Sequence, residues 1–255
     1  MVTEEAPTPS RQNHGLRHTA VVLFYRYFLT SEFPVLHKYE SFYEDKLLEL
    51  QKNLCHRLGL KGRVLLSAEG VNGTVSAPSM DIIDKYIEEM ESFELIRDCG
   101  LPSNDDGEAS SVTDDNKAEC LFQNVDWKKS FCGSSTLAEP FPDLKVSVVK
   151  EIISSGGGVS VDEIPQHGGR HLEPREFHRV LAEEPNVVLI DVRNTFECDI
   201  GHFINPHTKE AAINPEIVKF SMFDDTFCGK QAESLKDRKV LMYCTGKSTG
   251  EMYAL

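Results

Sequence analysis

Length, composition and charge limit the kind of protein that this sequence can specify. Its 255 residues suffice for one large domain or two of ordinary size, and 40% of them are apolar, which excludes a wholly disordered chain. The formal net charge of −14, from 27 Lys and Arg against 41 Asp and Glu, argues against a chain built mainly to coat nucleic acid, although it leaves room for a local basic groove.

The cysteines and the first residues indicate a reducing compartment. The 7 cysteines are scattered without a C-x-x-C pair, so they match neither a zinc site nor a compact disulfide framework. The acidic, proline-containing start lacks the features of a signal or transit peptide, and no apolar run reaches membrane-spanning length. We therefore expect a soluble, cytoplasmic protein with no membrane partner, no metal site and no identifiable cofactor.

The first half of the chain carries the periodicities of an α+β domain. After a polar tail at residues 1–18, which we expect to be disordered, residues 21–29 are apolar, β-branched and aromatic, as in a buried strand. Apolar residues at steps of three and four over residues 39–58 predict an amphipathic helix. Residues 63–77 predict two strands joined by a turn at 69–73, because glycine and the Asn-Gly pair tolerate positive φ.

The next segment completes the pattern of this domain. Residues 82–90 predict a second helix, and an acidic insertion follows at about residues 100–119. Residues 121–127 and 144–153 are further strand candidates. The order βαββαβ is that of a ferredoxin-like, or acylphosphatase-like, α+β domain, which we place at residues 19–153.

The second half predicts an α/β unit. The glycine-rich residues 154–169 are the best linker candidate, and the second unit is placed at residues 170–255. Residues 187–192 form a continuous apolar run, typical of a parallel strand buried on both faces, and residues 240–243 repeat it. Residues 217–227 are expected to be partly helical. In such a sheet, sites lie just beyond the carboxyl ends of the strands.

Cys244 stands at one of these strand ends and is the candidate nucleophile. A nucleophilic thiol needs its thiolate form, and a strand-to-helix loop supplies backbone N–H groups and a helix N-terminus that stabilise this charge. Cys244, Thr245 and Gly246 begin such a loop. By position alone, a cysteine at a strand end is more often a small buried apolar residue, and that alternative stays open.

Two segments resemble rhodanese-like domains. Residues 191–203 (DVRNTFECDIGHF) resemble the "DVR…E…IGH" segment of these domains, and residues 239–246 (KVLMYCTG) resemble the strand and the start of the active loop. The resemblance implies an α/β rhodanese-like fold and places the persulfide-forming cysteine of the family at Cys244.

The same resemblance implies a supporting network. It assigns Asp191, Arg193 and Glu197 to an acid–base network beside the loop. The alternative is a structural ion-pair cluster at a strand end, which serves stability rather than catalysis. We expect His202 to be a turn residue rather than a base.

The front half narrows the resemblance to one family. Residues 58–76 and 144–153, together with the two rhodanese-like segments, resemble the tRNA uridine hydroxylases (TrhO or YceA). This resemblance implies oxygen-dependent 5-hydroxylation of the wobble uridine of tRNA, with Cys244 essential, tRNA as partner and molecular oxygen as co-substrate. No metal or flavin motif explains how oxygen is activated.

Isolated basic residues of the first domain could belong to a phosphate-binding face, although such residues beside strands are usually just solvated. They are Lys61, Arg63, Lys145 and Lys150.

The end of the chain departs from the family pattern. The loop arginine expected five positions after Cys244 is replaced by Thr249, and the chain ends at Leu255, before the helix and strand that complete a rhodanese-like domain. We therefore expect an incomplete domain from a truncated or alternatively spliced product, with loss of activity as an open alternative. Two further functions stay open: a sulfurtransferase that takes sulfur from thiosulfate or a persulfide donor, and a non-catalytic RNA- or protein-binding module.

Overall fold

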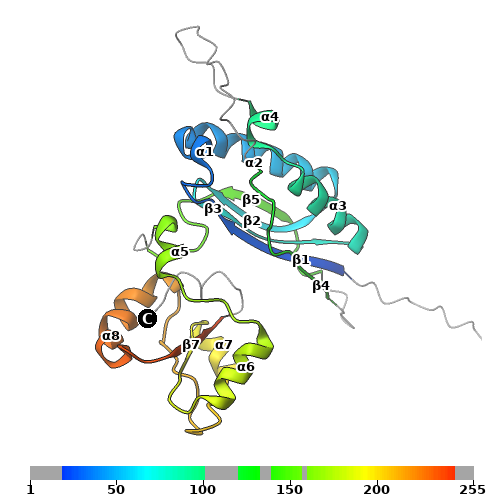
Figure 1. The fold of residues 1–255 in the computed structure, drawn as a ribbon. Helices are drawn as coiled ribbons and strands as arrows, with labels where there is room; N and C mark the ends of the chain where they lie inside the picture. Colours follow the sequence, from blue (N-terminus) through cyan, green and yellow to red (C-terminus); the bar gives the residue numbers. More distant parts are fainter. Residues whose placement is uncertain (1–18, 101–119, 133–138, 157–159, 245–255) are drawn as a thin grey trace, which may run out of the picture.

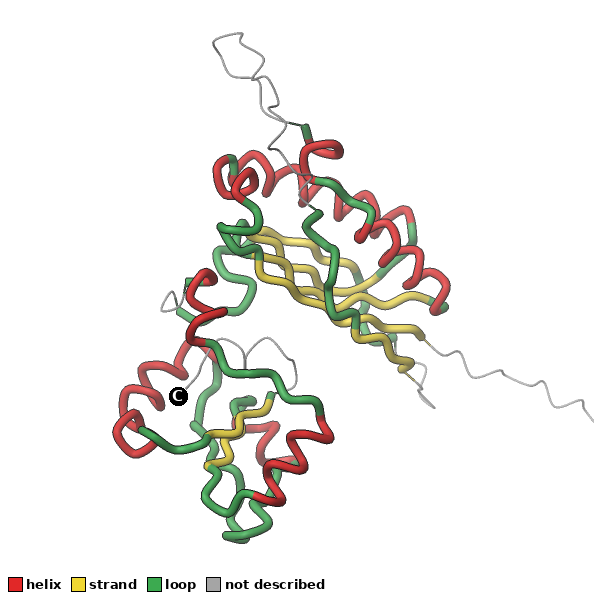
Figure 2. The backbone as a smooth tube through the Cα atoms, viewed as in Figure 1, coloured by secondary structure: helices red, strands yellow, loops and turns green. Residues whose placement is uncertain are grey.

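The computed structural model describes residues 19–100, 120–132, 139–156 and 160–244, shown in Figures 1 and 2. The predicted tail, most of the acidic insertion and the loop residues Thr245, Gly246 and Thr249 lie outside these ranges. The described residues form two sheets, one of five strands and one of two.

The first unit is built around the larger sheet, which has the strand order β4-β1-β3-β2-β5. Its elements are β1 (Thr19–Tyr27), α1 (Pro34–Lys38), α2 (Glu40–Arg57), β2 (Lys61–Ser67), β3 (Gly70–Ala77), α3 (Met80–Glu91), α4 (Leu95–Cys99), β4 (Lys128–Cys132) and β5 (Leu144–Val148). Strands β1 to β4 pair antiparallel in the order 4-1-3-2, and β5 extends the sheet parallel to β2. The predicted ferredoxin-like βαββαβ fold is therefore confirmed, with a fifth strand added at one edge.

The two long helices cover one face of this sheet, as Figure 1 shows. Strand β1 buries alternate residues, among them Ala20, Val22 and Phe24, because side chains of a strand alternate between its two faces. Tyr43 of α2 and Tyr86 of α3 are fully buried in the same core. The helical periodicity in the sequence thus correctly predicted that one face of each helix is apolar and packs on this core.

The fourth strand lies later than the sequence indicated. Residues 121–127, predicted as a strand, form a turn and an extended segment, and β4 begins only at Lys128. Leu121, Phe122 and Val125 are buried in the core, so their apolar character reflects packing rather than pairing in the sheet. The pattern was misleading because a buried loop and a buried strand are both rich in apolar residues, so a short apolar run does not distinguish them.

The turn between β2 and β3 also differs from the prediction. Only Ala68 and Glu69 separate the strands, while Asn72 and Gly73 lie within β3. A Cβ on Gly73 would lie 2.5 Å from Cζ of Phe24, so this glycine is needed for close packing and not for a turn. The Asn72 side chain donates from Nδ2 to the Ile152 carbonyl oxygen at 3.0 Å and ties β3 to the segment after β5.

The segment between the two sheets, predicted as a linker, contains the 3-10 turn η1 (Val161–Glu163) and the short helix α5 (Ile164–His167). Ser160 and Glu163 form a capping box at the start of η1. The Asp162 carboxylate accepts hydrogen bonds from the backbone N–H and the hydroxyl of Thr30, at 2.8 and 2.5 Å. These contacts fasten the segment to the turn that follows β1.

The second unit holds the parallel pair β6 (Val188–Asp191) and β7 (Val240–Tyr243). Its helical elements are α6 (Pro174–Glu183), α7 (Thr195–Ile200), η2 (Phe220–Met222), the π-helical η3 (Asp224–Cys228) and α8 (Gly229–Leu235). Strand β6 sends Val188 and Ile190 into one apolar cluster and Leu189 into another, so it is buried on both faces as its continuous apolar run predicted. The partly helical character expected for residues 217–227 is also present.

No helix in the described parts of the chain combines the length and the apolar character that crossing a membrane requires.

Candidate active site

Cys244 directly follows β7, at the carboxyl edge of the two-stranded sheet. Because β6 and β7 are parallel, their carboxyl ends meet there, and Asp191 pairs in register with Tyr243. The backbone N–H of Val192 donates to the Tyr243 carbonyl oxygen at 3.0 Å and fixes the backbone just before the cysteine. Cys244 is half-buried and packs in part against the apolar cluster around Ile190. The thiol is thus held by the core on one side and reachable on the other.

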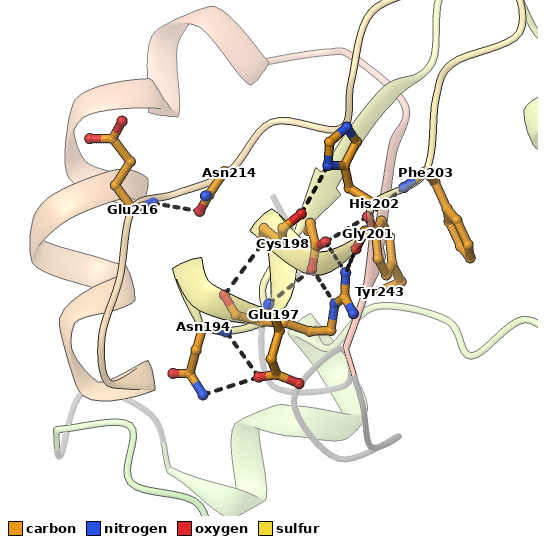
Figure 3. A network of polar contacts seen from close by, with 11 residues as sticks. Asn194, Glu197, Cys198, Gly201, His202, Phe203, Asn214, Glu216 and Tyr243 are labelled. Carbon is orange, nitrogen blue, oxygen red and sulfur yellow. Dashed lines mark hydrogen bonds and ion pairs between the residues drawn. The ribbon is translucent and has the colours of Figure 1, made fainter.

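Asp191 and Arg193 form an ion pair beside this cysteine. Arg193 donates from Nε to Oδ1 of Asp191 at 2.9 Å and from Nη2 to Oδ2 at 2.6 Å, in the two-point geometry that suits a carboxylate. Its Nη2 also donates to the Gly201 carbonyl oxygen at 2.5 Å. The Tyr243 hydroxyl adds a third side-chain donor to the carboxylate, at 2.7 Å from Oδ2. The network therefore connects β6, the end of α7 and the residue that precedes Cys244, as Figure 3 shows for Gly201 and Tyr243.

The protonation states within this network follow from its contacts. Burial by itself raises the pKa of Asp191, but the hydrogen bonds from Arg193 and Tyr243 outweigh it, so the pKa lies below the ordinary aspartate value. Hydrogen bonding to Asp191 raises the pKa of Arg193. Burial, followed by the bond to Asp191, raises the pKa of Tyr243 to about 12. Near neutral pH, Asp191 is thus ionised, Arg193 is charged and the Tyr243 hydroxyl remains a donor.

Glu197 lies at the start of α7. Its Oε2 accepts from the backbone N–H of Asn194 at 3.3 Å and from Nδ2 of Asn194 at 3.1 Å, completing a capping box (Figure 3). These bonds give Glu197 a helix-capping role that the sequence did not suggest. Its support of the active loop stays a prediction, since Thr245 and Gly246 lie outside the described residues.

His202 and Cys198 are structural in their contacts. The Nδ1 of His202 lies 2.9 Å from the Cys198 carbonyl oxygen, and His202 itself lies outside the turn formed by residues 206–208, so its expected turn role stays a prediction. Burial raises the pKa of the Cys198 thiol to about 11, so this nearby cysteine remains protonated at neutral pH. Cys198 is also buried and does not line the cavity beside Cys244, whereas Cys244 is half-buried and does, so Cys198 is the poorer candidate nucleophile.

A cavity of about 1100 Å³ opens beside Cys244 and is shared by the two units. The second unit contributes residues of α6, β7 and the segments around residues 170 and 204, and the first unit contributes Leu23 and β4. Its wall includes both charged and aromatic side chains. The basic ones are Lys128, Lys129, Arg170, His171, His178 and Lys239.

The charge of this wall differs from that of the whole chain. None of the described residues that line the cavity is Asp or Glu, although the chain carries 41 acidic residues against 27 Lys and Arg. Five of the six basic side chains form ion pairs with carboxylates outside the described wall: Lys128 with Asp126, Lys129 with Asp84, Arg170 with Glu176, His171 (when protonated) with Glu173, and Lys239 with Glu184. Ion pairs between largely exposed side chains contribute little to stability, so an anionic ligand can compete for these cations. The cavity is thus suited to an anionic ligand.

The basic residues singled out in the sequence lie elsewhere. Strands β2 and β5, which carry or border them, are at the far edge of the sheet from β4. Lys61 pairs with Glu139, and Arg63 pairs with Asp143, beside β5. The phosphate-binding face expected there is therefore not part of the cavity beside Cys244. The Lys128-Lys129 pair was the missed signal, and only the tertiary structure, which places β4 beside the cavity, shows that it borders the site.

The described residues contain no group of three or more His, Cys, Asp or Glu side chains that could hold a metal ion.

Comparisons with known proteins match both halves of the chain. A family model described as the UPF0176 acylphosphatase-like domain matches residues 19–152. Over 245 residues, the chain is 32% identical to Rhodanese-like domain-containing protein 6 of Arabidopsis thaliana, covering 91% of this chain and 35% of that protein.

Bacterial relatives named tRNA uridine(34) hydroxylase also match. The protein of Corynebacterium aurimucosum is 33% identical over 77% of this chain and 53% of its own length. That of Nitrobacter winogradskyi is 32% identical over 78% of this chain and 64% of its own length. The chain thus spans between about a third and two thirds of the length of these three relatives.

Proposed function

We propose that the site of this chain acts on the wobble uridine of tRNA. The premise is that the chain belongs to the UPF0176 family, whose bacterial relatives are named tRNA uridine(34) hydroxylase. The reaction replaces the C5–H bond of the uracil ring by C5–OH. One atom of molecular oxygen enters the product and the other leaves as water, so two electrons and two protons must come from an external reductant. Cys244 is the essential residue of the site.

One observation carries this proposal: Cys244 opens into a cavity whose described wall is basic and free of acidic side chains. An RNA backbone carries one negative charge per nucleotide, and phosphate contacts supply much of the affinity of RNA-binding proteins. The acylphosphatase-like sheet contributes β4 to this wall, which gives the first domain a part in holding RNA next to the cysteine of the second.

The network around Asp191 has a positioning role in this proposal. Asp191 and Arg193 hold Tyr243, and Tyr243 is covalently joined to Cys244. A fixed backbone at this point holds the thiol at one place on the cavity wall, and reacting groups held in a fixed geometry react faster. Neither Asp191 nor Arg193 lines the cavity, so they act through Tyr243 and not on the substrate.

The proposal is tested by restoring the modified nucleoside in cells. The chain is expressed in bacteria that lack their own uridine hydroxylase, and 5-hydroxyuridine in digested tRNA is measured by mass spectrometry. We expect product with the wild-type chain and at least a hundredfold less with Cys244→Ala, because loss of an essential nucleophile removes most of the rate. Cys132→Ala, a change at an exposed cysteine of β4, is the matched control and should keep full product.

Absence of product with the wild-type chain, or equal product with Cys244→Ala, would overturn the hydroxylase proposal.

A second candidate function is sulfur transfer, favoured by the place of Cys244 at the end of a parallel strand beside the Asp191–Arg193 pair. In this reaction the thiolate attacks the outer sulfur of a donor such as thiosulfate, forms a persulfide and releases sulfite. The persulfide then passes its outer sulfur to an acceptor. Cyanide-dependent formation of thiocyanate and a mass increase of one sulfur atom on Cys244, without 5-hydroxyuridine, would favour this function over hydroxylation.

A third outcome, retained RNA binding with neither product, would indicate the non-catalytic binding module.

A further inference from the structure

Three aromatic rings form a cluster on the cavity wall beside Cys244. The rings of Phe203 and Tyr243 lie with centroids 4.4 Å apart and planes at 31°, and Phe177 lies 6.1 Å from Phe203 and 6.4 Å from Tyr243. All three residues line the cavity. A hydrogen bond also joins Phe203 to Tyr243, because the backbone N–H of Phe203 donates to the Tyr243 hydroxyl at 3.0 Å.

Within this cluster, Phe203 is the exposed member, with 50% of its surface open to solvent. Its ring points away from the polar network, as Figure 3 shows, while its backbone is bonded into that network. A single exposed apolar residue needs no explanation by itself. This one, however, rests on a fixed aromatic neighbour and borders a cavity that contains the candidate nucleophile. Its open ring surface is therefore available to another planar group.

The ring contact links this surface to the site. Tyr243 contacts the Phe203 ring and directly precedes Cys244. The Cζ of Arg193 lies 5.4 Å from the centroid of the Tyr243 ring, in a cation–π contact. A group stacked on Phe203 would thus occupy the same cavity as the thiol, on a support that the Asp191 network holds in place.

The surrounding charge selects the class of ligand. An exposed aromatic ring among basic side chains, with no acidic side chain on the described wall, matches the way in which proteins hold single-stranded nucleic acid. The base stacks on the ring and the phosphates contact Lys and Arg. A bare phosphate would leave the aromatic ring without a counterpart.

We propose that Phe203 is the base-stacking platform of this site, on which an unstacked nucleobase of single-stranded RNA lies beside Cys244. This inference rests on the proposed RNA-modifying function and names the residue that receives the base. It assigns Phe203 a binding role, because the residue contacts the substrate and transfers no proton or electron.

The test measures binding of the full chain to an RNA hairpin that carries the fluorescent base 2-aminopurine at the wobble position of its loop. We expect Phe203→Leu to weaken binding about tenfold, because one base–aromatic stack is lost. Phe203→Trp should bind at least as tightly as wild type and quench the emission of the base more deeply. A hairpin with an abasic nucleotide at that position should bind the wild-type and Phe203→Leu chains about equally.

Phe196→Leu is the matched control. Phe196 lies on α7, is 61% exposed and does not line the cavity, so its change should leave binding unaltered. Phe203→Trp keeps a large ring at the site and reports on stacking even if the leucine variant is unstable.

The outcomes separate this inference from the proposed function. RNA binding that is equal in wild type, Phe203→Leu and Phe203→Trp, with no change in emission, would overturn the platform and leave the hydroxylase proposal standing. A tenfold loss in Phe203→Leu without any 5-hydroxyuridine in cells would support the platform and overturn the hydroxylase. Failure of the wild-type chain to bind the hairpin would overturn the platform and contradict the proposed RNA-directed function as well.

Discussion

At the scale of single residues, Asp191 shows how a charge can be kept inside the protein. Its side chain has 0% of its surface exposed, yet it accepts hydrogen bonds from the Arg193 side chain, the Arg193 backbone and the Tyr243 hydroxyl. Burying an isolated carboxylate is strongly unfavourable, and these donors offset that cost. The result is an ionised group whose contacts determine where the residue before Cys244 lies.

The lowered pKa of Asp191 predicts a dependence of stability on pH. A carboxylate with a lower pKa in the folded than in the unfolded state stabilises the fold above its unfolded value of about 4, and this contribution is lost as pH falls through the folded value. Asp191→Asn, which leaves the half-buried Arg193 without its counter-charge, should lower the free energy of unfolding by about 1–3 kcal/mol at neutral pH. The difference from wild type should narrow below about pH 4, as measured by urea unfolding.

Asp199→Asn serves as the control for this experiment, because Asp199 is exposed on α7 of the same unit. Its change should be close to neutral at every pH. A gap between wild type and Asp191→Asn that stays constant from pH 7 down to the acid limit would contradict an ionised Asp191.

At the scale of elements, the pairing of β1 with β3 depends on a glycine inside a strand. Phe24 and Gly73 are register partners, and the Phe24 ring covers the place where a Cβ of residue 73 would lie. The fully buried Phe24 also contacts the rings of Tyr86 and Trp127. Gly73 therefore allows one large ring to join the sheet to α3 and to the segment before β4.

Gly73→Ala should destabilise the first unit by about 1–3 kcal/mol, because the added methyl group lies 2.5 Å from a ring that has no free space to move into. Chemical unfolding followed by circular dichroism measures this difference. Gly201→Ala is the control, since no atom lies within 4 Å of a Cβ at that position, and it should be nearly neutral. Equal stability of both variants would show that the Phe24 ring adapts and that Gly73 is dispensable.

At the scale of the whole molecule, the candidate site belongs to neither unit alone. Cys244 and its supporting network come from the second unit, whereas β4 of the first unit brings Lys128 and Lys129 to the same cavity. Figure 1 shows the second unit on the side of the sheet that the helices α2 and α3 leave uncovered. The acylphosphatase-like sheet thus serves as one wall of a site whose proposed nucleophile lies on the other.

Reversing charge on this wall should weaken RNA binding. We expect Lys128→Glu with Lys129→Glu to lower affinity for a tRNA anticodon hairpin at least tenfold at low salt and to reduce the salt dependence of binding, because fewer counterions are released. Lys61→Glu is the matched control, because Lys61 lies toward the opposite edge of the sheet, on β2 next to β5. If Lys61→Glu weakens binding as much as the double variant, the basic face lies at β2 and β5 and not at the cavity.

How far the sequence leads can be seen from particular elements. The periodicities at residues 39–58 and 82–90 and the apolar runs before Asp191 and Cys244 correctly predicted the helices and strands, because alternation and helical spacing are local properties of the chain. The two strands predicted over residues 63–77 are present, but their turn lies at residues 68–69 and not at 69–73. The strand at 121–127 was wrong. In both places the deciding partners, Phe24 and the core around Phe122, come from distant positions.

The sequence by itself determined the α+β and α/β character of the two halves, the family and the position of Cys244 at a strand end, since all of these depend on local pattern or on linear motifs. Only the tertiary structure decided which side chains surround that cysteine. It brought Tyr243 under Phe203 and set β4 at the edge of the sheet that borders the cavity. The physical reason is that strand order and side-chain contact join residues far apart in the chain, which no local pattern records. The tertiary structure thus shows that Cys244, which the sequence placed only at a strand end, lines a cavity with basic and aromatic side chains.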